Sequence, residues 1–215
     1  CYKTEPDKTM ANRSIPYPRG KTLGGSSSIN GLLYIRGQEQ DYDIWRQLGN
    51  KGWSWKEVLP YFIKSENQER GRNEFHGIGG PLSVSDTRIK LDLLEKFMDA
   101  SEEKGIPRVE DFNKGNNFGC GYFQVTEKNG LRCSAAVGYL NPIKTRKNLK
   151  IETNCHVKKI NFHGTKAESV SFWKNGNLTE VKSNKEILLS AGSIGSTQIL
   201  QTSGIGNGEK LSNLG

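Results

Sequence analysis

The pattern of apolar positions changes near residue 149, from helical spacing to alternation. Upstream, the clearest helix is predicted over residues 89–104, where one face carries Leu91, Leu94, Phe97, Met98 and Ser101. Gly105 and Pro107 should end this helix. Because that face is mostly apolar, we expect it to lie against a core.

A second helix is predicted to begin after Ser54. Ser54 and Glu57 have the spacing of a capping box, and Trp53 and Val58 have that of a hydrophobic staple. Pro60 follows six positions after the cap, so we expect it to kink this helix or to begin another one.

Residues 1–30 are predicted to be a loop that ends in a tight turn. Gly24-Gly25-Ser26-Ser27 pairs two glycines with serines, a combination that can turn sharply and then cap a helix. Ile29, Leu32 and Leu33 follow at helical spacing.

Downstream, alternation predicts strands over residues 149–153 and 157–162. Val170 and Phe172 also alternate, and the turn Asn175-Gly176 should join them to a returning strand over 178–182.

A strand, a turn of small residues and a helix are predicted to close the sequence. The apolar run 187–191 is typical of a strand that is buried on both faces. Ser196 could cap a helix over 197–203, with Gly204 after its last turn. This order is half of a nucleotide-binding unit.

Composition narrows the class of protein. The chain has 215 residues, enough for one domain or two modest ones, and its 9% aromatic content argues against disorder. The apolar runs are too short for a membrane span. The net charge of +8 is dispersed, with no basic stripe and interleaved aromatics, so we expect no nucleic-acid partner.

Cysteines and histidines give no catalytic or metal-binding pattern. No pair of the four cysteines has metal-ligand spacing, and a disulfide between Cys120 and Cys133 stays open. His156 and His163 have no carboxylate at a fixed spacing, and His76 lies in a loop, so a structural or surface role is favoured for each. No metal site and no catalytic acid or base is predicted.

Two bends have the anatomy of an anion cradle, because glycines precede a predicted helix N-terminus. They are Gly24-Gly25-Ser26-Ser27 and Ala191-Gly192-Ser193. Either alone could be an ordinary turn, but the pair favours a dinucleotide cofactor. The usual G-x-G-x-x-G motif is missing, and the glycines at 115–121 have the wrong spacing. If a dinucleotide binds, its first βαβ unit should lie upstream of Cys1.

Two long stretches resemble the two signatures of the glucose-methanol-choline (GMC) oxidoreductase family. The first lies within residues 18–43 and includes Gly20-Lys21-Thr22-Leu23-Gly24-Gly25-Ser26-Ser27-Ser28-Ile29-Asn30-Gly31. The second is Ala191-Gly192-Ser193-Ile194-Gly195-Ser196-Thr197-Gln198-Ile199-Leu200. Segments that resemble family landmarks lie between them in the family order, including His76-Gly77 and Arg132-Cys133-Ser134-Ala135-Ala136. Tyr34-Ile35-Arg36-Gly37 is most similar to the insect glucose-dehydrogenase-like branch.

The resemblance implies a mixed α/β fold (α+β in part), with a Rossmann-like FAD-binding portion and part of a substrate domain. Its segments would be 1–30 covering the flavin, 31–144 in the substrate domain and 145–215 in the FAD domain. The residues that would bind FAD are Gly24, Gly25, Ser26, Asn30, Gly31, Leu32, Leu33, Val157, Ala191, Gly192 and Ser193. Some relatives attach the flavin to a histidine at the position of Ile29, so FAD should be non-covalent here. Thr197 replaces a proline that is usual in the second signature, at little expected cost.

The implied activity is oxidation of the CH–OH group of an alcohol or sugar, with hydride transfer to flavin N5 and re-oxidation by oxygen or a quinone. The catalytic residues of the family are not matched in this chain. Both ends look cut, so we expect an internal fragment that is inactive by itself. A pseudoenzyme or binding module that keeps the fold is the alternative. Two glycosylation sequons, at Asn12 and Asn177, favour secretion. The sequence leaves the substrate, the acceptor and the oligomeric state open.

Overall fold

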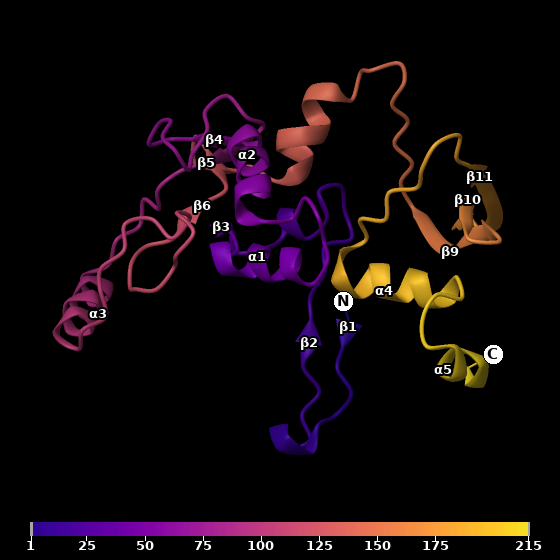
Figure 1. The fold of residues 1–215 in the computed structure, drawn as a ribbon, viewed down its shortest axis with the longest axis horizontal. Coiled ribbons are helices and arrows are strands. Elements are labelled where there is room, and N and C mark those ends of the chain that lie inside the picture. The colour runs from indigo at the N-terminus through magenta and orange to yellow at the C-terminus, as the bar shows by residue number, and fades with distance from the viewer. Residues whose placement is uncertain (1, 215) are drawn as a thin grey trace. The chain divides into compact units, whose positions relative to one another are not determined.

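The computed structural model describes residues 2–214, and the chain divides into two compact units, Cys1–Leu149 and Lys150–Gly215 (Figure 1). The helices of the first unit are α1 (Glu39–Gln47), α2 (Trp55–Ser65) and α3 (Asp92–Glu103). Its strands are β1 (Tyr2–Lys3), β2 (Pro16–Tyr17), β3 (Leu33–Tyr34), β4 (Glu66–Gln68), β5 (Leu82–Val84), β6 (Gln124–Val125), β7 (Glu127–Lys128) and β8 (Leu131–Arg132). Each of these strands pairs with a single partner, in the order β1-β2, β3-β6, β4-β5 and β7-β8.

The first thirty residues are not all loop. β1 and β2 pair as an antiparallel hairpin, with Tyr2 opposite Tyr17, and a short 3-10 helix at Lys8–Met10 lies at its tip. Figure 1 shows this hairpin as a narrow arm of the first unit. The prediction that residues 1–30 are a loop was therefore wrong in part.

Helix α2 begins where its capping box predicted. The Ser54 amide donates to Glu57 Oε2 at 3.0 Å, and the Ser54 hydroxyl donates to the same oxygen at 2.6 Å. Pro60 lies inside this one helix and starts no new one. Trp55 and Val58 are buried, and Trp53 borders the same apolar hollow as Val58, which is consistent with the staple.

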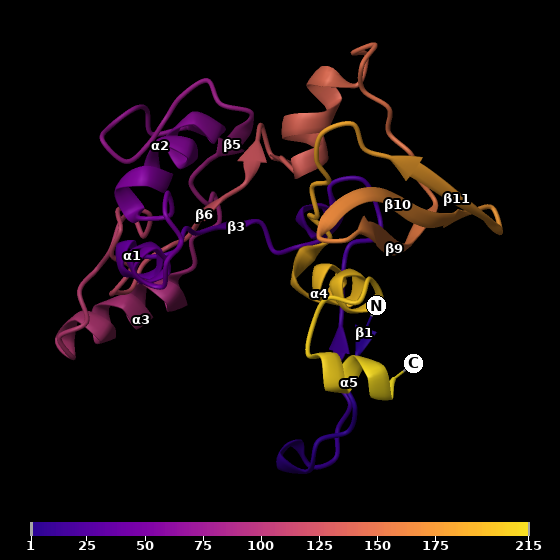
Figure 2. The ribbon, with the colours of Figure 1, turned by 45° about the vertical axis from the view of Figure 1, so that its right-hand side comes forward.

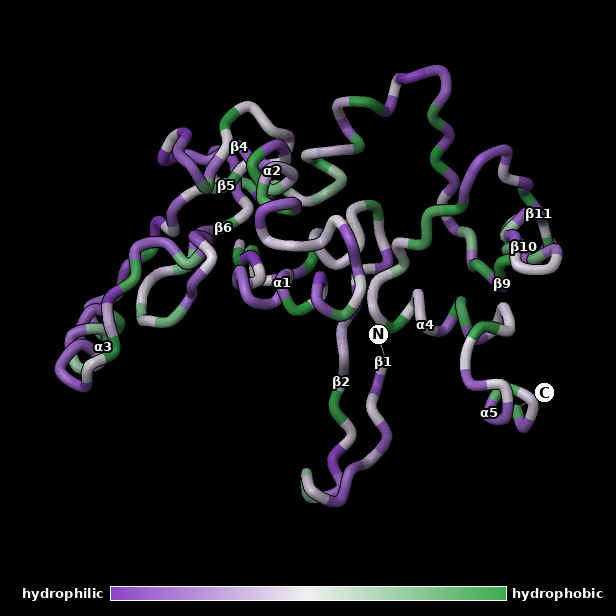
Figure 3. The backbone as a smooth tube through the Cα atoms, in the orientation of Figure 1, coloured by the Kyte–Doolittle hydropathy of each residue, from purple (hydrophilic) through white to green (hydrophobic). Residues whose placement is uncertain are grey.

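Helix α3 has the predicted position but not the predicted burial. Met98 and Ser101 are buried, whereas Leu94 is 42% and Phe97 is 64% exposed. Figure 3 shows polar and apolar residues mixed around this helix. Only the Met98–Ser101 side lies against the unit, so the expectation that the whole face packs on a core was wrong.

The second unit is a three-stranded antiparallel sheet with two helices, α4 (Gly192–Thr202) and α5 (Gly208–Asn213). Its strands β9 (Cys155–His163), β10 (Lys166–Lys174) and β11 (Asn177–Lys182) are ordered β11-β10-β9. The β10–β11 turn confirms the predicted hairpin, because Asn175 and Gly176 have φ of 50° and 81°, the positive values of a type I′ turn.

Helix α4 is fastened to β9, and Figure 2 shows it beside the sheet. Thr202 Oγ1 donates to the Lys158 carbonyl at 3.0 Å, and Ser203 Oγ accepts from the Ile160 amide at 2.8 Å. Ile160 itself is buried.

Three predictions for this unit are corrected. Residues 149–153 form no strand. Residues 187–191 are not a buried strand either, since Leu188 is 80% exposed and nothing in residues 2–214 pairs with this run. A strand forms only where a neighbour satisfies its backbone. Helix α4 starts at Gly192 rather than after Ser196, whose Oγ instead accepts from the Ala191 amide at 3.1 Å.

Within the described residues, no helix has the length and apolar content needed to cross a membrane.

Candidate functional site

The Gly24 bend is a backbone turn that only glycine adopts without strain. Gly24 and Gly25 have φ of 86° and 54°, and Gly25–Ser28 then forms one 3-10 turn. The helix expected after the serines does not continue. Leu32 has φ of 69°, and Leu33 begins β3.

One side of this bend is packed tightly. A Cβ added at Gly20 would lie 2.1 Å from the Gly25 carbonyl oxygen, and one at Gly24 would lie 3.1 Å from the Ala136 amide nitrogen. Ser27 Oγ accepts from the Ala135 amide at 2.9 Å. The bend therefore packs against Ala135 and Ala136.

Two other glycines, Gly25 in the bend and Gly31 after it, have open space around them. A Cβ added at Gly25 or at Gly31 would meet no atom within 4 Å. Bare backbone is thus presented at both positions, which lets a flat ring or a phosphate approach the main chain closely.

The next residues are anchored by β6. The Leu32 carbonyl accepts from the Thr126 amide at 2.8 Å, and Leu33 pairs with Val125. Leu33 is itself 55% exposed. The structure therefore brings Gly24, Gly25, Ser26, Asn30, Gly31, Leu32 and Leu33 together in one bend and the strand that follows it.

Arg132, on the β7–β8 hairpin, fixes the middle of the bend. Its Nη1 donates to the Ser27 carbonyl at 3.1 Å and to Asn30 Oδ1 at 2.7 Å, and its Nη2 donates to the Asn30 carbonyl at 2.8 Å. Sequence analysis placed this arginine only in a family landmark. Its partners lie more than 100 positions away, so no local pattern could have revealed the contact.

The second bend opens helix α4. Gly192 has φ of 79°, and the helix that it begins is 11 residues long, so its first turn carries free N–H groups and a partial positive charge. Thr197 is accommodated, because its Oγ1 donates to the Ser193 carbonyl at 2.7 Å. Val157 lies on β9 opposite Phe172 and is half-buried. Ala191, Gly192, Ser193 and Val157 belong to the second unit, so their approach to the Gly24 bend stays a prediction.

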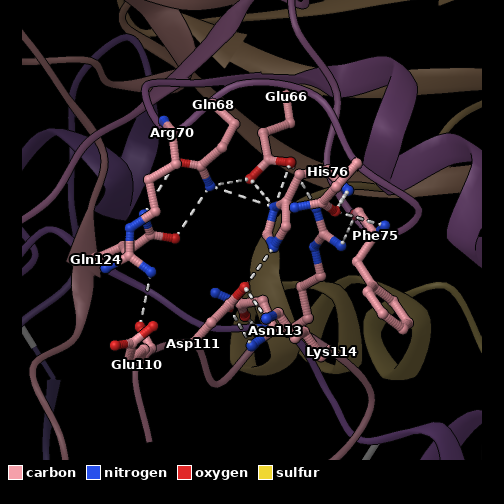
Figure 4. A network of polar contacts seen from close by, with 12 residues as sticks. Glu66, Gln68, Arg70, Phe75, His76, Glu110, Asp111, Asn113, Lys114 and Gln124 are labelled. Atoms are coloured by element: carbon pink, nitrogen blue, oxygen red, sulfur yellow. Dashed lines mark hydrogen bonds and ion pairs between the residues drawn. The ribbon is translucent and has the colours of Figure 1, made fainter.

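The first unit also contains a buried polar network around His76 (Figure 4). His76 Nδ1 lies 2.9 Å from Glu66 Oε2, and Nε2 lies 2.9 Å from Asp111 Oδ2. Arg36 Nη2 donates to Glu66 Oε2 at 2.8 Å. Gln68 bridges Glu66 and Gln124. The side chains of Arg36, Glu66 and His76 are almost completely buried.

Two opposite effects act on this network. Burial lowers the pKa of His76, but the hydrogen bonds from Asp111 and Glu66 outweigh it and raise that pKa above its ordinary value. Burial raises the pKa of Asp111, and the contact with His76 reverses this and lowers it. The charged form of His76 is thus favoured between two carboxylates, a buried arrangement that supports the preference for a structural role.

The other histidines and the cysteines do not form a catalytic or metal-binding group in the described residues. His156 and His163 are exposed on β9. Cys120 and Cys133 are free thiols, so the disulfide left open by the sequence does not form. In the part of the chain that is described, no group of His, Cys, Asp and Glu side chains could hold a metal ion.

Known proteins match the chain along its whole length. A family model described as GMC oxidoreductase matches residues 7–215. Human mitochondrial choline dehydrogenase is 40% identical over 215 residues, which are 100% of this chain and 36% of that protein. An FAD-dependent oxidoreductase from Chaetomium thermophilum superimposes with a TM-score of 0.91 at 32% identity, covering 100% of this chain and 40% of that one.

A second solved structure, pyridoxine 4-oxidase from Mesorbium loti, superimposes with a TM-score of 0.90 at 32% identity and covers 98% of this chain and 42% of that one. The chain thus spans about two fifths of the length of these relatives. The mixed α/β fold of an FAD-binding flavoprotein is confirmed.

Proposed function

The chain belongs to the GMC oxidoreductase family, and on that premise we propose that it is the part of an FAD-dependent alcohol oxidoreductase that holds the flavin. FAD is the cofactor of this family of flavoproteins. The observation that carries the proposal is the Gly24 bend, which is closely packed at Gly20 and Gly24 and leaves bare backbone at Gly25 and Gly31.

We propose a binding surface in this chain for each half of the cofactor. Gly24, Gly25 and Ser26 would bind the flavin and pyrophosphate side, and Asn30, Gly31, Leu32 and Leu33 would lie beside the isoalloxazine ring. The N-terminus of α4, with Ala191, Gly192 and Ser193, would stabilise the negative charge of the ADP part, since unpaired N–H groups and the helix dipole favour an anion there. Val157 would contact the adenine.

FAD, when bound, supplies the acceptor for a hydride that leaves the substrate carbon. The residues of this chain bind and orient the ring for that step. None of the three histidines is offered as the base that takes the hydroxyl proton, because His76 is buried in its ion pairs and the other two are exposed on β9. The isoleucine at position 29 has no atom that can bond to the flavin, so we propose non-covalent FAD.

The substrate class is a primary or secondary alcohol, and choline is the first compound to test, because a choline dehydrogenase is 40% identical to this chain. Sugars, as in the insect glucose-dehydrogenase-like branch, remain the second class. The acceptor is oxygen or a quinone, and the oxidase among the solved relatives supports including oxygen.

We keep the predicted roles of the segments: 1–30 covers the flavin, 31–144 contributes to the substrate domain, and 145–215 contributes to the FAD domain. Secretion is also kept as a proposal. Asn12 and Asn177 are both exposed, as glycan acceptors must be. A mass shift of the secreted protein on treatment with an N-glycosidase would support it, and an unglycosylated protein retained in cells would refute it.

The test is anaerobic titration of the full-length protein. We expect a flavin absorption band that bleaches on addition of choline or another alcohol and returns with oxygen or a quinone. A colourless protein, or a yellow one that no alcohol or sugar reduces, would favour the pseudoenzyme instead.

A further inference from the structure

Arg132 is the side chain that holds the open bend in one shape. Its guanidinium donates to the Ser27 carbonyl at 3.1 Å, to the Asn30 carbonyl at 2.8 Å and to Asn30 Oδ1 at 2.7 Å. The planar guanidinium presents its donors to these three acceptors in a fixed arrangement, whereas a lysine ammonium is a point charge on a flexible stem. We propose that Arg132 is a positioning residue for the flavin, acting through the amide of Asn30. The inference rests on the proposed function.

The chemistry of the contact fixes which end of the Asn30 amide faces outward. A guanidinium can donate but cannot accept, so the atom of Asn30 that faces it must be the oxygen. The same Oδ1 also accepts from the Leu32 amide, at 3.1 Å. The Asn30 NH₂ group is therefore turned away from Arg132, and it has no hydrogen-bond partner within residues 2–214. An exposed donor of fixed orientation lies beside Gly31, where the bare backbone is open.

The positive charge of Arg132 is not cancelled by a carboxylate. No ion pair in the described residues includes this side chain. Glu127, its partner across the β7–β8 hairpin, instead accepts from the Gly130 amide at 2.9 Å. All three partners of the guanidinium are neutral oxygens of the bend, so its field adds to the attraction of this surface for an anionic group.

The experiment uses the full-length, flavin-loaded protein with Arg132→Lys, Arg132→Gln and Asn30→Asp. The matched control is Arg108→Lys, because that arginine is also partly exposed and bonds three partners, but these are carboxylates on α3. The FAD dissociation constant, the flavin absorption spectrum, the midpoint potential, kcat and KM are measured for each.

We expect both Arg132 variants to bind FAD at least tenfold more weakly and to lower kcat more than they raise KM. Arg132→Gln should also lower the midpoint potential, whereas Arg132→Lys, which keeps the charge, should hold it near the wild-type value. Asn30→Asp can still pair with Arg132 and should fold, yet it should weaken FAD binding and alter the spectrum because a donor is replaced by an acceptor. Arg108→Lys should leave all five quantities unchanged.

A double-mutant cycle tests the route through Asn30. If Arg132 acts through that amide, Arg132→Lys should add little to the loss of FAD affinity already caused by Asn30→Ala. Fully additive losses, or Arg132 variants whose FAD affinity and spectrum match wild type, would overturn the inference. If an Arg132 variant does not fold, an Asn30→Asp protein with wild-type FAD affinity and spectrum would overturn it as well. A wild-type protein that binds no FAD would instead refute the proposed function.

Discussion

The substitution Gly31→Ala tests whether this glycine is needed for binding FAD or for the fold itself. A Cβ at this position meets no protein atom within 4 Å, and Gly31 is not among the glycines of the described chain with a positive φ. The substitution should therefore leave the protein unstrained and stabilise it by about 0.4–1 kcal/mol, through the lower entropy of the unfolded chain. In the proposed complex, however, the added methyl group points into the space that the isoalloxazine ring would occupy.

The expected penalty on binding follows from the cost of overpacking. Forcing one extra methyl group into a filled site costs about 1–3 kcal/mol. At about 1.4 kcal/mol per factor of ten, FAD should bind about 5- to 150-fold more weakly. The assay is flavin fluorescence titration of the full-length apoprotein, with thermal unfolding in parallel.

Gly208→Ala is the matched control, because its Cβ also meets nothing within 4 Å and its φ is likewise not positive, yet it begins α5 rather than the bend. It should leave FAD affinity unchanged. Gly31→Ala protein that melts no lower than wild type and binds FAD with the wild-type constant would refute the placement of the flavin at this bend.

The remaining predictions concern the cofactor bond, the buried network and a helix cap. Acid precipitation should release all FAD into the supernatant, since Ile29 cannot bond to it; a yellow pellet would contradict this. His76→Gln should lower the free energy of unfolding by about 3–5 kcal/mol, because it removes the cation at 2.9 Å from the buried Asp111 carboxylate and leaves Glu66 with Arg36 alone. Folding raises the pKa of His76, so the stability that its charge contributes is fully present below pH 6.5. The difference in unfolding free energy between wild type and variant should therefore narrow as the pH rises further. Urea unfolding at several pH values measures this difference, and a difference that widened would refute the reasoning. Ser54→Ala should cost about 1 kcal/mol in the same assay, through loss of the α2 capping box, and an unchanged midpoint would count against the cap.

The elements that were predicted correctly are those decided by residues close together in the sequence. The Ser54–Glu57 box starts α2, and the Asn175-Gly176 turn joins β10 to β11, because both are decided by residues within a few positions of each other. The sharp bend at Gly24-Gly25 was likewise visible as two adjacent glycines.

Contacts between segments that are distant along the chain could not be predicted from local sequence patterns. His76 has no acidic residue at a telling spacing, yet Glu66 and Asp111 reach its two nitrogens from 10 and 35 positions away. Arg132 reaches Asn30 across 102 positions. The apolar run 187–191 failed for a related reason, since apolar character indicates a strand but does not supply the neighbour with which it must pair.

In the proposed complex, both bends hold one cofactor. A crystal structure of the flavin-loaded, full-length protein measures this directly. We expect density for a single FAD, with its flavin end against residues 24–33 and its ADP end at the N-terminus of α4. A structure in which FAD contacts only one of these segments, or in which they lie on separate faces of the protein, would contradict it.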